Sequence, residues 1–200
     1  FSNQIGISGG SSGIITIGQN EVYGNTSSGI QPGGSYDHVV GNVVHDNPTG
    51  ISASYAYGAT IEDNRVFNNS SQGIYVYYYD VTVRGNQVYS NSIGIDVYNS
   101  GSETRVENNV VYANTEYGVL LRGHGASVTN NTIYQEVGDA VRVANGNYIA
   151  EIQNNILWIK AGRVLFVASG SEPGVSSDFN LIFTDGVAAK AGYWGGVERV

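Results

Sequence analysis

The side chains best suited to chemistry are tyrosines, one aspartate and two arginines, which recur along the sequence at intervals of roughly 22 residues. Aromatic rings stack on the C–H face of a sugar, and arginine makes forked hydrogen bonds to hydroxyl or carboxylate groups. We therefore predict a carbohydrate-contacting surface. Its expected substrate-binding residues are Tyr75, Tyr77, Tyr98, Asp96, Arg122 and Arg142.

A catalytic interpretation of the same region is β-elimination from a uronide. In it, Arg122, Arg142 or His124 serves as base or carboxylate clamp. Tyr77 or Tyr98 donates the proton, and Asp96 is the remaining catalytic candidate. A glycosidase instead needs two carboxylates about 5–9.5 Å apart. Asp96 gains such a neighbour only if a loop carries Asp80 to it.

An internal repeat must position these residues. Each repeat unit, here called a cell, contains the pattern N-x-(V/I/L)-(aromatic or His). Further apolar residues stand three places before the asparagine and nine or ten places after it. Three apolar positions per cell predict three short strands, because period-2 alternation recurs and no helical stripe does. The repeated asparagines are at positions 20, 42, 64, 86, 109, 131, 155 and 180.

A chain that winds once per cell stacks each strand on its copy in the next coil. The predicted fold is all-β: a right-handed, single-stranded parallel β-helix of about eight coils, each of roughly 22 residues, with three short parallel sheets. It spans residues 1–185 with an incomplete first coil, and a Gly/Ala-rich tail at 186–200 is expected to cap the last coil. The stacked asparagines are expected to form a ladder of amide hydrogen bonds.

The third strand of each coil has two columns of outward positions. The first column is predicted to be Gln31, Ser52, Tyr75, Asp96, Leu120, Arg142 and Leu165. The second is predicted to be Gly33, Ser54, Tyr77, Tyr98, Arg122, Ala144 and Val167.

Two segments, 83–91 (VRGNQVYSN) and 106–114 (VENNVVYAN), each followed by glycine and an aliphatic residue, carry a family resemblance. The sequence resembles the right-handed parallel β-helix repeat family of the pectate-lyase-like superfamily over about residues 14–185. That family includes polysaccharide lyases, glycoside hydrolases, uronan epimerases and repeat regions of large secreted bacterial proteins. The resemblance implies a secreted or cell-surface bacterial location. The Asp-Pro-His-Asp stretch of the epimerases is not in this sequence.

Composition narrows the partners. The formal net charge of −8 argues against nucleic acid and against anionic membranes. There is no cysteine, and we expect no cofactor, with calcium as the one alternative. A calcium-dependent lyase gathers several carboxylates, and only Asp80 and Glu103, at equivalent positions in neighbouring coils, come near that pattern.

The chain begins at Phe1, so we expect a segment of a longer polypeptide. Open coil ends predict end-to-end self-association or stacking on upstream coils. The function predicted from the sequence is that of a non-catalytic β-helix segment of an extracellular protein, serving as a rigid spacer or carbohydrate-contacting surface. The alternative is a lyase or epimerase acting on an acidic polysaccharide.

Overall fold

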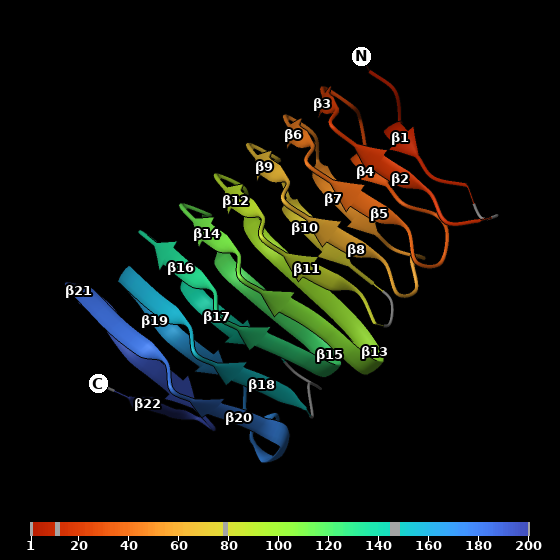
Figure 1. The fold of residues 1–200 in the computed structure, drawn as a ribbon. Coiled ribbons are helices and arrows are strands. Elements are labelled where there is room, and N and C mark those ends of the chain that lie inside the picture. The colour runs from red at the N-terminus through yellow and green to blue at the C-terminus, as the bar shows by residue number, and fades with distance from the viewer. Residues whose placement is uncertain (1, 11–12, 78–79, 145–148, 200) are drawn as a thin grey trace.

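The computed structural model describes residues 2–10, 13–77, 80–144 and 149–199. The chain forms a parallel β-solenoid of about eight turns, and each strand pairs with its copy in the next turn (Figure 1). The predicted fold is therefore confirmed. The described residues contain one 3₁₀ turn, η1 (Glu172–Gly174). They contain no helix that is long and apolar enough to cross a membrane.

The strands form three stacked columns, called sheets 1, 2 and 3. Sheet 1 contains β2 (Thr16–Gly18), β5 (His38–Val40), β8 (Thr60–Glu62), β11 (Thr82–Arg84), β18 (Ala150–Gln153) and β20 (Val175–Asp178). Sheet 2 contains β3 (Glu21–Tyr23), β6 (Val43–His45), β9 (Arg65–Phe67), β12 (Gln87–Tyr89), β14 (Val110–Tyr112) and β16 (Thr132–Gln135). Sheet 3 contains β1 (Ile5–Ser8), β4 (Ser28–Gln31), β7 (Thr49–Ala53), β10 (Gln72–Val76) and β17 (Asp139–Val143).

Four longer strands bend from one sheet into the next. β13 (Ile93–Glu107) and β15 (Tyr117–Thr129) begin in sheet 3 and end in sheet 1. β19 (Ile156–Val167) and β21 (Leu181–Trp194) begin in sheet 2 and end in sheet 3. β22 (Val197–Arg199) then turns back and pairs antiparallel with the end of β21.

Aliphatic side chains fill the interior of the solenoid. The three inward columns are represented in one coil by Val83, Val88 and Ile95, all fully buried. A glycine precedes the third column where the chain passes close to the next coil. A Cβ at Gly94 would lie only 2.5 Å from the Gly118 carbonyl oxygen, so the tight corner requires glycine there.

The repeated asparagines form the predicted buried ladder. Asn86 illustrates the pattern: its backbone N–H and its Nδ2 both donate to Asn109 Oδ1, at 2.9 and 3.0 Å. Its Oδ1 accepts the equivalent pair from Asn64. Each asparagine therefore closes a corner of its own coil and joins it to the next.

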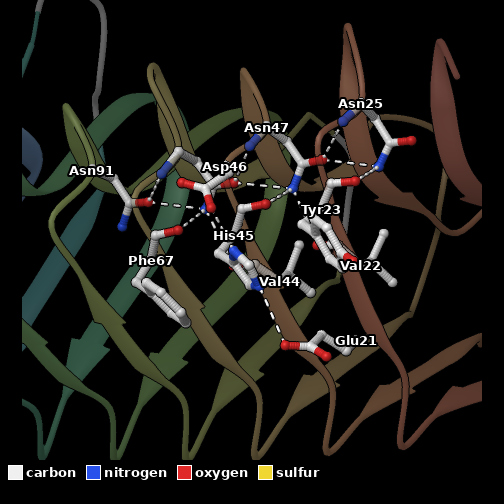
Figure 2. Close-up of polar contacts among 11 residues, drawn as sticks. Glu21, Val22, Tyr23, Asn25, Val44, His45, Asp46, Asn47, Phe67 and Asn91 are labelled. Atoms are coloured by element: carbon white, nitrogen blue, oxygen red, sulfur yellow. Dashed lines mark hydrogen bonds and ion pairs between the residues drawn. The ribbon is translucent and has the colours of Figure 1, made fainter. Parts of the chain in front are cut away.

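A second asparagine ladder runs along the corner between sheets 2 and 3, and Figure 2 shows it linking neighbouring coils. It ends at Gln135, whose Oε1 accepts from the Asn114 N–H at 2.9 Å. Gln135 is fully buried, and its Nε2 has no hydrogen-bond partner in the described part of the chain. The next coil places Ile159 at this position, which stops the ladder.

An aromatic ladder follows the outer surface of sheet 2. His45 lies between the rings of Tyr23 and Phe67, with centroids 5.0 and 4.9 Å away (Figure 2). Its Nδ1 contacts Asp46 at 2.7 Å and its Nε2 contacts Glu21 at 3.4 Å. We therefore assign His45 to a stacked column of rings and not to a reaction centre.

The C-terminal segment continues the coil. The predicted boundary at residue 185 falls inside β21, whose residues 188–194 pair in parallel with β19. β22 pairs with Gly192, Tyr193 and Trp194 and so covers one of the last strand edges. End-to-end association stays a prediction.

Candidate functional site

The outer surface of sheet 3 stacks the predicted site residues coil upon coil. Tyr75 of β10 pairs with Asp96 of β13, and Tyr98 of β13 pairs with Arg122 of β15. Tyr77 directly follows β10, and its N–H donates to the Ala53 carbonyl at 3.1 Å. The parallel register thus brings residues about 22 positions apart in sequence into neighbouring coils.

The sheet 3 part of β19 differs from the predicted columns by one residue. Arg142 pairs with Phe166, whereas Leu165 pairs with Val141. Val167 pairs with Val143 and so does not follow Ala144 as predicted. The asparagine spacing increases from 22 to 24 residues at this coil, and a one-residue shift exchanges the two faces of a strand.

Asp96 and Arg122 form a two-pronged ion pair. Arg122 Nε donates to Asp96 Oδ1 at 3.0 Å, and Nη2 donates to Oδ2 at 2.5 Å. Gln72 Nε2 also donates to Oδ2, at 3.4 Å. The Arg122 side chain is 37% exposed, whereas Asp96 is fully buried. Arg122 is therefore the member that can touch a ligand, and Asp96 positions it.

Burial raises the pKa of Asp96 above its ordinary value of 3.8, while Arg122 and then Gln72 act in the opposite direction. Burial also raises the pKa of Tyr75, and the Asp96 carboxylate raises it further. Tyr75 therefore remains a neutral phenol at neutral pH, able both to donate and to accept a hydrogen bond.

Tyrosine rings form the apolar part of the site. Tyr77 and Tyr98 are parallel within 3°, with centroids 5.2 Å apart. The ring centroids of Tyr75 and Tyr77 are 6.2 Å apart. The guanidinium carbon of Arg122 lies 5.3 Å from the ring centroid of Tyr98. Tyr77 and Tyr98 are each 43% exposed. We call Tyr75, Tyr77, Tyr98 and Arg122 the tyrosine face.

The coil before the tyrosine face carries serines at the corresponding positions. Ser52 pairs with Tyr75, and the backbone contact of Tyr77 to Ala53 places Ser54 in the Tyr77 column. The Ser52 and Ser54 hydroxyls are 2.8 Å apart. Serine is too small to cover a tyrosine ring, so the ring stack ends beside a small polar step.

Arg142 belongs to a separate cluster. Its Nη1 donates to Asp139 at 2.8 Å, and its guanidinium lies 3.7 Å from the Phe166 centroid and 5.1 Å from that of Tyr117. Phe166 in turn stacks on Tyr193 at 4.7 Å. The structure therefore does not bring Arg142 into direct contact with Asp96 or Arg122.

The other candidates lie around these two clusters. His124 is half-buried on β15, two residues beyond Arg122. Glu103 pairs with Arg105 at 2.7 Å. Asp80 accepts a hydrogen bond from Tyr57 and thereby raises the pKa of that phenol. Within the ranges described, no group of three His, Asp or Glu side chains is arranged to hold a metal ion.

Sequence reasoning missed Asp139, Gln72 and Phe166. Asp139 stands three residues before Arg142 on the same strand, and strand alternation predicts opposite faces for that spacing, so the spacing does not identify it as the partner. Gln72 begins β10, and sequence alone gave no sign that its amide turns toward the next coil. Phe166 was missed because the predicted first column continues from Arg142 to Leu165, whereas Arg142 pairs with Phe166.

Comparison with known proteins agrees with this architecture. Residues 1–133 match the family model described as "Right handed beta helix region". The chain therefore belongs to the right-handed β-helix family. No curated protein matches the sequence.

Two solved structures show the same fold. One is the Dettilon tailspike protein (gp208), with a TM-score of 0.63 and 16% identity over 88% of this chain and 49% of that chain. The other is the alginate lyase from Paenibacillus sp. str. FPU-7, with a TM-score of 0.60 and 15% identity over 92% and 86% of the two chains. The chain spans about half the length of the tailspike protein.

Proposed function

We propose that this chain is a non-catalytic β-helix segment whose tyrosine face binds a polysaccharide. The observation that carries the proposal is the stack of half-exposed Tyr77 and Tyr98 beside the held guanidinium of Arg122. Aromatic surface and directed hydrogen-bond donors are the two requirements of sugar recognition. We further propose that the chain works outside the cell, as a rigid part of a longer protein.

The shape of the site supports this proposal. The ring stack ends at the smaller side chains of Ser52 and Ser54, and the proposal places a pyranose ring there, against Tyr77. The strands beneath are paired on both sides, so binding requires little ordering of the backbone. A regular rod also presents its surface at a fixed distance from neighbouring parts of a longer protein.

The alternative function, elimination from a uronide, has less support. It needs a cation available to the substrate carboxylate and a base that reaches the substrate. Arg122 and Arg142 both hold aspartates, and Asp96 has no exposed surface. The alginate lyase likeness at 15% identity concerns the fold. Binding is therefore the better-supported function.

The proposal is tested with the double variant Tyr77→Ala/Tyr98→Ala. We expect its affinity for a polysaccharide that the parent binds to fall by roughly 10–100-fold, because each lost ring contact contributes about 1 kcal/mol of binding free energy. Affinity electrophoresis in gels containing single polysaccharides measures the change. Tyr23→Ala, which removes a ring from sheet 2, is the control and should bind like the parent. Undiminished binding by the double variant would overturn the proposal.

A further inference from the structure

We infer that the tyrosine face selects uncharged glycans and rejects polyuronates. The inference rests on the proposed function and narrows its ligand class. The one charged residue of the face, Arg122, is neutralised by Asp96. The chain as a whole carries a formal charge of −8, so it offers a polyanion no general attraction.

Arg122 is not available as a carboxylate clamp. Its Nε and Nη2 are both directed at Asp96, in the parallel geometry that a uronate carboxylate would need. A uronate that captured Arg122 would leave Asp96 fully buried without its cation. Breaking a buried pair in this way is costly, so the resident carboxylate excludes the incoming one.

Arg142, one coil further on, is also paired with an aspartate, through a single hydrogen bond from its Nη1. Its partner Asp139 has only 5% of its side chain exposed. Asp139 Oδ1 also accepts the Arg163 N–H at 2.9 Å, which fixes the carboxylate in place. Phe166 lies close to the Arg142 guanidinium. Two successive arginines of sheet 3 are thus neutralised from within the fold.

The groups that remain for a ligand are suited to hydroxyls. Asp96 uses two of the three guanidinium nitrogens of Arg122 and leaves Nη1, with two N–H donors, on the partly exposed side chain. The phenol of Tyr75 and the hydroxyl of Ser54 each donate and accept. Together with the rings of Tyr77 and Tyr98, they offer an uncharged sugar donors, acceptors and apolar surface.

The test compares soluble neutral polysaccharides (glucans, galactans and mannans) with alginate and polygalacturonate, at low and at high salt. We expect binding of at least one neutral polymer with little salt dependence, and no binding of either uronate. Tighter binding of a uronate, weakening as salt rises, would overturn the inference and leave the proposed function standing. Binding of neither class would overturn both.

Asp96→Asn sharpens the test, because it keeps the shape of the side chain and releases the charge of Arg122. We expect this variant to gain affinity for alginate or polygalacturonate by about tenfold or more, in a salt-dependent manner. Asp185→Asn makes the same change of net charge on an exposed residue of β21 and should gain nothing. If Asp96→Asn has the parent's circular dichroism spectrum and melting temperature but gains no uronate affinity, the inference fails.

Discussion

Asn86→Ala is expected to lower the free energy of unfolding by about 3–5 kcal/mol. The side chain is fully buried, and its Nδ2 donates to the carbonyls of Ile61 and Arg84 as well as to Asn109 Oδ1. Its Oδ1 accepts from the backbone and side chain of Asn64. Alanine removes every one of these bonds and leaves buried polar groups in two coils unsatisfied.

Urea unfolding followed by circular dichroism measures this loss. The matched control is Gln87→Ala, which removes an exposed amide side chain from the adjacent position. Its effect should stay within about 0.5 kcal/mol. Similar losses for the two variants would show that the ladder contributes no more to stability than a surface amide does.

Arg122→Ala is expected to lower the free energy of unfolding by about 2–4 kcal/mol at neutral pH, because it leaves the buried Asp96 carboxylate without its cation. The cost should shrink as the pH falls. Burial already raises the pKa of Asp96 in the folded parent, and loss of Arg122 raises it further. The folded variant therefore binds a proton at Asp96 more tightly than the unfolded chain does. The stability that this proton contributes is lost as the pH rises through the pKa of Asp96 in the folded variant.

The measurement is the unfolding free energy of parent and variant across the acidic to neutral range. The double variant Arg122→Ala/Asp96→Asn carries no buried charge and should recover much of the loss at neutral pH. An Arg122→Ala cost that is independent of pH and unrelieved in the double variant would contradict the assigned pairing.

The sequence predicted the fold well because the fold depends on a repeated local pattern. Asn86 and its copies mark one corner in every coil, and Val83 and Val88 on either side of it must point inward. Register then follows, since a slip would expose these side chains. Tyr75 and Asp96 could be placed in one column for the same reason.

The pairing of polar side chains was harder to predict. Asp96 stands at an outward position, yet Arg122 and its other neighbours bury it completely. No sequence periodicity predicts this burial of Asp96. Arg142 turns back along its own strand to Asp139, and its guanidinium lies against the ring of Phe166. Sequence patterns therefore placed Tyr75 beside Asp96 and Tyr98 beside Arg122 in neighbouring coils, but did not predict their side-chain contacts.

The central claim is that a glycan lies on the tyrosine face, and a nuclear magnetic resonance titration tests it most directly. A neutral oligosaccharide is added to the isotope-labelled chain, and the amide signals that move are mapped onto the structure. We predict shifts confined to the coils of β7, β10, β13 and β15 around Tyr77, Tyr98 and Arg122. Saturable shifts centred elsewhere, for example on the exposed Trp158 and Phe183 of sheet 2, would contradict the account.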